Sequence, residues 1–206
     1  MAGRYKTVLL FGAPGAGKGT QGQLLGSIPG FFHMSTGDMF RSLDKESELG
    51  ETFFEYSSKG ELVPDEVTIE LWHTYVHAQT ILGLFKPHTD LLILDGIPRT
   101  VAQTSLMEKY IDVLGIIHLN ALNPEDMIAR LRNRALQEKR VDDAKEEVIR
   151  TRLDIYSRET RPVLNHYDPS MIHDIDAIGS LGRVLKNILD VVTPIQESCH
   201  SKPAKV

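Results

Sequence analysis

The feature that most constrains the fold of this chain is a glycine-rich segment between a short apolar run and a stretch with helical spacing. The apolar run, residues 7–11, leads into Gly-Ala-Pro-Gly-Ala-Gly-Lys-Gly-Thr at residues 12–20, which has the Gly-x4-Gly-Lys spacing of a phosphate-binding loop. Such a loop needs glycine because its backbone N–H groups turn inward around a phosphate and leave no room for Cβ atoms. The next helix adds the positive end of its dipole. The predicted phosphate-binding residues are Gly15, Ala16, Gly17, Lys18, Gly19 and Thr20.

A second interpretation of the same glycines is weaker. Residues 17–22 also fit Gly-x-Gly-x-x-Gly, the dinucleotide fingerprint, but that alignment would place Gly22 well inside the helix instead of at the turn. Gly19 stands where many phosphate loops carry the hydroxyl that binds Mg²⁺, and the hydroxyl follows one residue later at Thr20. We therefore expect a particular sub-type of phosphate loop.

The rest of the chain alternates short apolar runs with longer stretches of helical spacing. The runs lie at residues 7–11, 31–35, 91–94, 116–119 and 171–175. Runs without polar alternation are typical of a parallel sheet covered by helices on both faces. We expect an α/β fold of the P-loop NTPase type, with three layers and a central parallel sheet of five strands.

One domain accounts for residues 1–193, with core segments 1–34, 64–133 and 141–193. Two segments fall outside the alternation and are expected to cover a substrate: the polar, helical 35–63 and the basic 134–140. Residues 194–206 are polar and without periodicity, so we expect a disordered tail there.

Composition excludes several classes of function. Among 206 residues, 23 are Lys or Arg and 28 are Asp or Glu, so the net charge of −5 lacks the basic excess of a nucleic-acid-coating domain. The single cysteine, Cys199, allows neither an internal disulfide nor a zinc cluster of paired cysteines. The first apolar run is too short for a signal peptide or a membrane span. We expect a cytoplasmic protein with no structural zinc and no nucleic-acid or membrane partner.

Four ordered motifs give the chain a family resemblance from about Val8 to Val192. The motifs are Gly-Lys-Gly-Thr-Gln at 17–21, Ser-Thr-Gly-Asp-Met-Phe-Arg at 35–41, Asp-Gly-Ile-Pro-Arg-Thr at 95–100 with Gln103, and Arg-Val-Asp-Asp at 140–143 with Thr-Arg-Leu at 151–153. With these motifs the chain resembles the nucleoside monophosphate kinases, and within them the adenylate kinases with a short lid. The resemblance implies that 35–63 is the monophosphate-binding insert and that 134–140 is the lid.

The chemistry of several residues in these motifs points to phosphate or metal binding independently of the family resemblance. Asp95 closes a buried strand, where open α/β sheets place ligand groups, and a carboxylate beside a phosphate loop can hold Mg²⁺ directly or through water. Arg99 and Arg41 offer planar forks that match the paired oxygens of a phosphate.

A cluster of five cations lies between residues 130 and 140. Like charges four residues apart, as at Arg130 and Arg134, destabilise a helix unless an anion sits among them. By resemblance, Arg130 lies against the adenine of ATP, and Arg134, Arg140 and Arg152 close over the transferred phosphoryl group, held in place by Asp142 and Asp143. The cluster consists of Arg130, Arg132, Arg134, Lys139 and Arg140.

The resemblance implies the reaction Mg²⁺ATP + AMP ⇌ Mg²⁺ADP + ADP. Charge neutralisation is the expected means of catalysis, because a monophosphate is already ionised near pH 7 and needs no general base. Lys18, Arg99, Arg134, Arg140 and Arg152 are the expected catalytic residues. The ATP site is expected at the loop residues with Arg130, Arg134 and Gly179, and the AMP site at Thr36, Arg41, Glu61, Leu62, Val63, Gly96, Ile97, Pro98, Arg99, Gln103, Arg140 and Arg152.

AMP is favoured as the acceptor by two residues. Thr36 stands where pyrimidine-specific relatives typically carry Ala, and the amide of Gln103 can pair with both a donor and an acceptor on adenine. Two residues depart from the family pattern: Ile97 replaces the usual Phe, and Glu61 replaces a residue that is often basic.

Other functions remain open at this point. A UMP/CMP kinase would share the fold and chemistry with a different acceptor. A non-catalytic nucleotide sensor or GTPase-like switch is less consistent, because the chain has no Asn-Lys-x-Asp guanine-binding motif and every arginine expected from the resemblance is present. A monomer is the family expectation.

Overall fold

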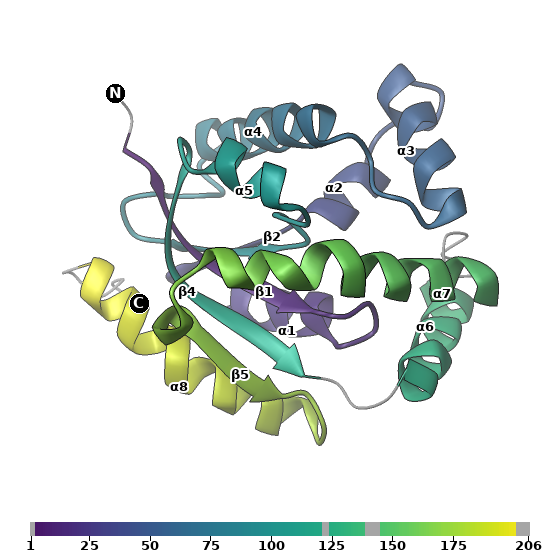
Figure 1. Ribbon diagram of the computed structural model, residues 1–206. Coiled ribbons are helices and arrows are strands. Elements are labelled where there is room, and N and C mark those ends of the chain that lie inside the picture. Colours follow the sequence, from purple (N-terminus) through teal and green to yellow (C-terminus); the bar gives the residue numbers. More distant parts are fainter. Residues whose placement is uncertain (1–2, 121–123, 139–144, 201–206) are drawn as a thin grey trace.

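The computed structural model describes residues 3–120, 124–138 and 145–200. Five parallel strands form one sheet in the order β2-β3-β1-β4-β5. Helices cover both faces, as Figure 1 shows. The predicted fold class, three layers around a parallel five-stranded sheet, is confirmed. The strands are β1 (Tyr5–Gly12), β2 (Phe31–Ser35), β3 (Leu91–Asp95), β4 (Ile111–Asn120) and β5 (Ile172–Asp176).

The central strands are continuous apolar runs because both of their faces are covered. All five residues of β3 are buried, and β1 beside it is buried from Thr7 to its end. Strand β4 begins five residues earlier than its apolar core suggests. Ile111 pairs with Tyr5, and an irregularity in register between Thr7 and Val8 accommodates one unpaired residue of β4, Leu114.

The helices follow the strands in the order that the sequence predicts. Four of them begin at a polar side chain that accepts a backbone N–H of the first turn: Ser35, Ser47, Thr100 and Ser180. They are α1 (Lys18–Gly26), α2 (Thr36–Arg41), α3 (Glu48–Lys59), α4 (Asp65–Ile81), α5 (Val101–Met107), α6 (Pro124–Glu138), α7 (Glu146–Ile155) and α8 (Leu181–Cys199), with short turns η2 (Tyr156–Thr160), η3 (Arg161–His166) and η4 (Pro169–Met171).

Two hydrophobic cores hold the layers together. On one face, α4 and α5 bury Trp72, Val76 and Met107 against the sheet. On the other face, α1 and α8 bury Leu25 and Ile188 against alternate residues of the same strands. A third, smaller cluster joins α6 to α7 away from the sheet. The sheet is therefore fixed on both faces, while the insert helix α3 and the pair α6–α7 stand at its carboxyl end (Figure 1).

The carboxyl-terminal helix is longer than predicted. We expected a disordered tail from residue 194, but α8 continues through Pro194 to Cys199. Ile195 packs against the core under α8, and the side chain of Gln196 lies close to Gly30. Apolar contact thus holds the last turns despite the proline. Within the described ranges no helix is both long and apolar enough to cross a membrane.

Candidate active site

A cleft of about 570 Å³ opens at the carboxyl ends of the strands. Its walls come from the phosphate loop, the insert, the turn after β3 and the helices α6 and α7. This is where a parallel sheet with a change in strand order places its ligands. Most of the predicted site residues line it: Gly15, Ala16, Gly17, Lys18, Gly19, Thr20, Thr36, Arg41, Glu61, Leu62, Val63, Asp95, Gly96, Pro98, Arg99, Gln103, Arg130, Arg134, Arg152 and Gly179.

The phosphate loop has the backbone that its glycines predict. Gly12 has a φ of 146°, and a Cβ there would lie 2.8 Å from the carbonyl oxygen of Leu119. Gly17 has a φ of 97° and directly precedes α1, so the first backbone N–H groups of that helix face the cleft. The loop leaves room for an anion above the end of β1.

Lys18 lies deep in this loop. Its ammonium donates to the carbonyl oxygens of Gly12 at 2.6 Å and Ala13 at 3.2 Å. Burial lowers the pKa of Lys18 to about 8; Asp95 opposes this, and the charges of three arginines lower the pKa further. Those arginines are Arg99, Arg152 and Arg134. Four cations from four elements therefore act on one another across the cleft.

Asp95 ends β3 between the phosphate-loop strand and β2. Its Cα is in register with Leu10 of β1 and Ser35 of β2, and the residue is only 6% exposed. Nε2 of His33 lies 4.0 Å from Oδ2 of Asp95, and burial lowers the pKa of this histidine. A neutral imidazole leaves the carboxylate free to act on a cation in the cleft.

The donor set at Asp95 fits Mg²⁺ bound together with a nucleotide. Across the described ranges, no three His, Cys, Asp or Glu side chains gather as a metal site. Mg²⁺ is usually coordinated by one or two carboxylates, with phosphate oxygens and water as its other ligands. A single buried carboxylate beside a phosphate loop is consistent with that coordination.

The turn after β3 positions Arg99. Its Nε donates to the carbonyl of Gly96 at 2.7 Å, and the hydroxyl of Thr36 donates to the same carbonyl at 3.0 Å. Ile97, predicted in the AMP site, is not among the residues that line the cleft: it is 2% exposed and packs in the core under α4. Ile97, which replaces the usual Phe of the family motif, thus occupies a position in the hydrophobic core.

Gln103 is held at both ends of its amide. Oε1 accepts the backbone N–H of Arg99 at 2.7 Å, and Nε2 donates to Oδ1 of Asp65 at 2.8 Å. The other carboxylate oxygen of Asp65 accepts the hydroxyl of Thr100 at 2.9 Å. The sequence analysis did not single out Asp65. An acid in the first turn of a helix ordinarily indicates only a favourable helix dipole.

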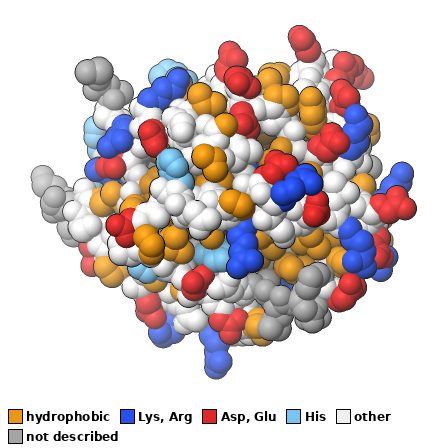
Figure 2. Space-filling view, viewed as in Figure 1, with side chains coloured by type: hydrophobic (Ala, Val, Ile, Leu, Met, Phe, Trp, Pro, Cys, Tyr) orange, Lys and Arg blue, Asp and Glu red, His pale blue; other side chains and the backbone are white. Residues whose placement is uncertain are grey.

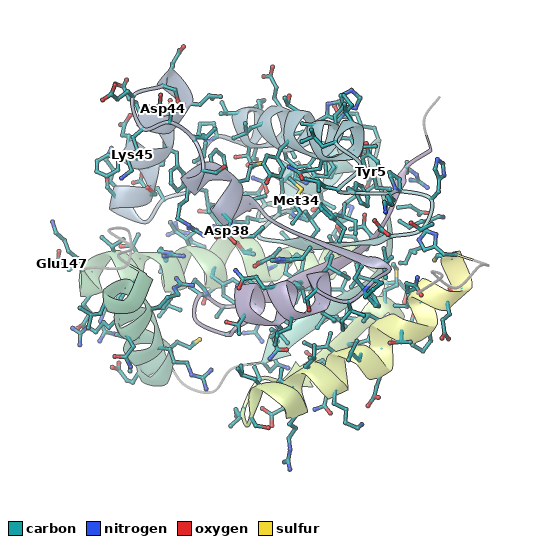
Figure 3. The ribbon with its side chains drawn as sticks, turned by 180° about the vertical axis from the view of Figure 1, so that it is seen from behind. Tyr5, Met34, Asp38, Asp44, Lys45 and Glu147 are labelled. Carbon is teal, nitrogen blue, oxygen red and sulfur yellow. The ribbon has the colours of Figure 1, made fainter. Side chains whose placement is uncertain are left out.

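The insert contributes the opposite wall. Arg41 donates to a carboxylate oxygen of Asp38 at 2.6 Å, and Phe40 stacks on Phe53 at 5.1 Å, which fastens α2 to α3. Figure 3 shows Asp38 between the insert and α1, whereas Asp44 and Lys45 lie at the insert's outer end. The insert therefore turns an arginine and an acid toward the cleft.

The end of the insert touches the helix that carries Arg152. Gly60 closes α3 so near to α7 that a Cβ there would lie 2.8 Å from the carbonyl oxygen of Val148 and 3.1 Å from Cγ of Arg152. The insert helix α3 and helix α7, which lie on two sides of the cleft, are thus in contact at Gly60.

The basic cluster near residue 134 divides into two groups. Arg130 and Arg134 lie on one face of α6 and line the cleft, as predicted. Arg132 instead pairs with Glu146 of α7, which also pairs with Arg150 at 2.8 Å. The Arg132–Glu146 pair joins α6 to α7, so the prediction that all five cations surround a phosphate is wrong for Arg132. Lys139, Arg140, Asp142 and Asp143 lie outside the described residues.

The surface does not add a second anion-binding face in the direction of Figure 2. Basic and acidic side chains are interspersed over the coloured residues there.

Tyr156 is a further lining residue that the sequence analysis missed. Its hydroxyl lies 3.2 Å from Nε2 of His118, and Nδ1 of that histidine lies 2.7 Å from Oδ1 of Asp174. This network ties the end of α7 to the edge of the sheet. It depends on residues up to 56 positions apart, so no local pattern indicates it.

The loop with Lys18 and the turn with Arg99 open into one cleft, an arrangement suited to two phosphorylated molecules side by side. That arrangement is the one of a nucleoside monophosphate kinase, a phosphotransferase. The chain belongs to the adenylate kinase family: the family model described as adenylate kinase matches residues 10–172.

Curated relatives agree over nearly their whole length. An adenylate kinase of Flavobacterium psychrophilum is 35% identical over 192 residues, which cover 90% of this chain and 97% of the relative. An adenylate kinase of Kocuria rhizophila is 36% identical over 188 residues, with 88% and 96% covered. One of Nocardia farcinica is 37% identical over 189 residues, with the same coverage of 88% and 96%.

Proposed function

We propose that the protein transfers the γ-phosphoryl group of Mg²⁺ATP to AMP, reversibly, with two molecules of ADP as products. The observation that carries this proposal is the convergence of cations on one cleft. Arg99, Arg152 and Arg134 each lower the pKa of the Lys18 ammonium, so their charges lie close enough to act on a single polyphosphate. The phosphates of ATP and AMP carry the negative charge that such a cluster of cations attracts.

The chemical step is an in-line displacement. An oxygen of the AMP phosphate attacks Pγ of ATP; the new P–O bond forms as the bond from Pγ to the oxygen shared with Pβ breaks, and that electron pair leaves on ADP. No proton is transferred, because the attacking oxygen is already ionised near pH 7. The protein therefore contributes orientation and positive charge on the equatorial oxygens.

Most of the predicted site residues take a part in binding or transfer. The phosphate loop and Lys18 hold the phosphates of ATP, while Arg130 lies along its adenine. Arg41 and Arg99 hold the AMP phosphate, and Arg134, Arg140 and Arg152 surround the transferred group. Gly179 and Tyr156 close the ATP side of the cleft.

Asp95 would hold Mg²⁺, directly or through its waters. A bound ion would supply positive charge that neutralises part of the charge on the ATP phosphates. The buried carboxylate is fixed in place by the parallel pairing of β3 on both sides.

AMP is the favoured acceptor over CMP and UMP. Thr36 is 2% exposed and bonded to the Gly96 carbonyl, so it fixes the entrance to the monophosphate site. The amide of Gln103 lines the same part of the cleft beside Leu62 and Val63, and it can pair with the donor and acceptor of an adenine edge.

The test is ADP formation by the purified protein with Mg²⁺ATP and, separately, AMP, CMP, UMP or GMP. We expect rapid turnover with AMP. Arg99→Ala should lower kcat by about 10²–10³-fold, the usual loss when one donor to developing charge is removed. Arg158→Ala is the matched control, because Arg158 is exposed and pairs with Asp154 outside the cleft. A preference for CMP or UMP would support the mechanism but contradict AMP as the acceptor. ATP binding without phosphoryl transfer would contradict the proposal that the protein is an enzyme.

A cytoplasmic monomer completes the proposal. A monomer is the expectation for the family, and ATP and AMP are both supplied in the cytoplasm. Sedimentation equilibrium tests the first point, since a dimer would double the mass of 23.1 kDa.

A further inference from the structure

The amide of Gln103 sits between a group that only accepts hydrogen bonds and a group that only donates them. The carboxylate of Asp65 accepts from Nε2 at 2.8 Å, and the backbone N–H of Arg99 donates to Oε1 at 2.7 Å. Gln103 is 2% exposed, so water cannot replace either partner. An amide turned end over end would point Oε1 at a carboxylate and its NH₂ at an N–H group. The two partners therefore permit one orientation.

Asp65 is the side chain that imposes this orientation. It is the first residue of α4, two positions after Val63 at the end of the insert, and it is partly buried. Its second oxygen accepts the hydroxyl of Thr100, which in turn accepts the backbone N–H of Gln103 at 3.0 Å. Both carboxylate oxygens are thus engaged by α5, and the carboxylate cannot rotate away from the amide.

The orientation decides what Gln103 can offer to a base. Each end of the amide has one bond inside the protein, so one N–H of Nε2 and one lone pair of Oε1 remain for the cleft. Adenine presents an N6–H donor and an N1 acceptor, in that order along its Watson–Crick edge. Guanine presents the reverse, an O6 acceptor and an N1–H donor. Only one of the two purines matches an amide that cannot turn.

We propose that Asp65 is a positioning residue that fixes the amide of Gln103 and thereby makes the acceptor site select AMP over GMP. This inference rests on the proposed function, since it concerns the acceptor of the same reaction. Cytosine has the donor and acceptor order of adenine, and uracil that of guanine. The same fixed amide accordingly disfavours UMP more than CMP.

The key variant is Asp65→Asn, which keeps the shape of the side chain. An asparagine amide carries no charge and can offer either a donor or an acceptor to Gln103. Residue 65 then no longer imposes one orientation on the Gln103 amide. We expect kcat/KM for AMP relative to GMP to fall about tenfold, equivalent to about 1.4 kcal/mol. We expect KM for AMP to rise, whereas kcat with saturating AMP and KM for ATP stay within about twofold of the parent values.

Glu66→Gln is the matched control. It makes the same change of charge one residue further along α4, where the side chain is exposed and does not line the cleft. It should leave the AMP to GMP ratio within about twofold of the parent value. Asp65→Ala, which removes both accepting oxygens, should lower the ratio at least as much as Asp65→Asn. If Asp65→Ala does not fold, Asp65→Asn still decides the matter.

Calorimetric titration of AMP and of GMP into each variant gives the same ratio without turnover. A purely structural role for Asp65 would lower the melting temperature and leave both ratios unchanged, and that result would overturn the inference. A parent protein that transfers no phosphoryl group to AMP would instead overturn the proposed function, so the two failures are distinguishable.

Discussion

The hydroxyl of Thr36 and the backbone of Gly96 are in direct contact across the ends of β2 and β3. The hydroxyl donates to the Gly96 carbonyl at 3.0 Å, and a Cβ placed on Gly96 would lie 2.6 Å from the hydroxyl oxygen. The same Cβ would lie 3.0 Å from a terminal nitrogen of Arg99. The entrance of the insert and Arg99, the arginine proposed to hold the AMP phosphate, are therefore packed against each other at one glycine.

Gly96→Ala should separate these groups. The residue has a φ of 86°, which a non-glycine side chain adopts at a cost of about 1–3 kcal/mol, and the new Cβ displaces either Thr36 or Arg99. We expect kcat/KM for AMP to fall about tenfold or more, in line with the effect of small displacements on a reacting pair. Steady-state kinetics and thermal unfolding measure the two effects.

Gly182→Ala is the matched control for this change. Gly182 lies in α8, has no positive φ, and a Cβ there would meet nothing within 4 Å. The substitution should stabilise the protein by about 0.5–1 kcal/mol and leave the kinetics unchanged. Normal kinetics in Gly96→Ala would show that the contact with Thr36 does not position the site.

The acidic side chain at residue 61 should weaken AMP binding. Glu61 is exposed and lines the cleft next to Leu62 and Val63. Unit charges about 4 Å apart in water interact by about 1 kcal/mol, and salt screens longer distances. We expect Glu61→Gln to lower KM for AMP about two- to threefold at low salt, with kcat unchanged.

Salt provides the check on that explanation. The advantage of Glu61→Gln should shrink at high ionic strength, where exposed charges are screened. Glu70→Gln removes an exposed acid of α4 that does not line the cleft, and it should leave KM unaltered. An equal KM for parent and Glu61→Gln at low salt would rule out a direct charge effect.

Local pattern was sufficient to predict the fold. The continuous apolar runs and the phosphate loop specify parallel strands and their order of connection, because a strand buried on both faces needs no polar alternation. Strand β4 is longer than its apolar core because residues 111–115 include Asp112 and Gly115. Their place in the sheet is set by pairing with β1, more than 100 positions away.

The candidate site was predicted less completely, for a related reason. Lys18 and Arg99 belong to motifs that are contiguous in sequence, and both line the cleft. Asp65 acts through Gln103, 38 positions away, and Arg132 pairs with Glu146 on the next helix. A charge alone does not reveal whether its partner will be a substrate or another side chain.

Two partly buried tyrosines should make the protein sensitive to alkali. Burial raises the pKa of Tyr156 to about 12; for Tyr167 burial raises it to about 12 as well, with a hydrogen bond from Thr104 acting in the opposite direction. In the unfolded chain tyrosine ionises near pH 10. Between about pH 10 and 12 the unfolded state therefore binds fewer protons than the folded state, and stability falls as the pH rises.

Tyr156→Phe should make that fall less steep. Removing one such group reduces the slope of unfolding free energy against pH by up to about 1.4 kcal/mol per pH unit in this window. The variant also loses the contact with His118, so its stability at neutral pH should be lower. Denaturant unfolding at several pH values tests both points, and Tyr167→Phe should give a similar, additive change. A slope unaffected by either variant would contradict the assignment.

The last turns of α8 should contribute to stability. Ile195, in the last turns of α8, packs so closely against β4 that a Cβ on Gly115 would lie 2.9 Å from Cδ1 of Ile195. The carbonyl of His88 accepts Nδ1–H of His200 at 3.0 Å. A chain ending at Thr193 loses these contacts. We expect it to unfold with about 1–2 kcal/mol less free energy, the scale of one partly buried apolar side chain.

A chain ending at His200 is the control, because it keeps α8 whole. It should melt within a degree or so of the full chain, as expected for removal of a short polar terminus. Ile195→Ala in the full chain should reproduce most of the loss seen in the chain that ends at Thr193. Equal melting temperatures for the two truncated chains would mean that residues 194–200 contribute no net stability. The apolar contact of Ile195 would then only balance the backbone hydrogen bond that Pro194 cannot donate.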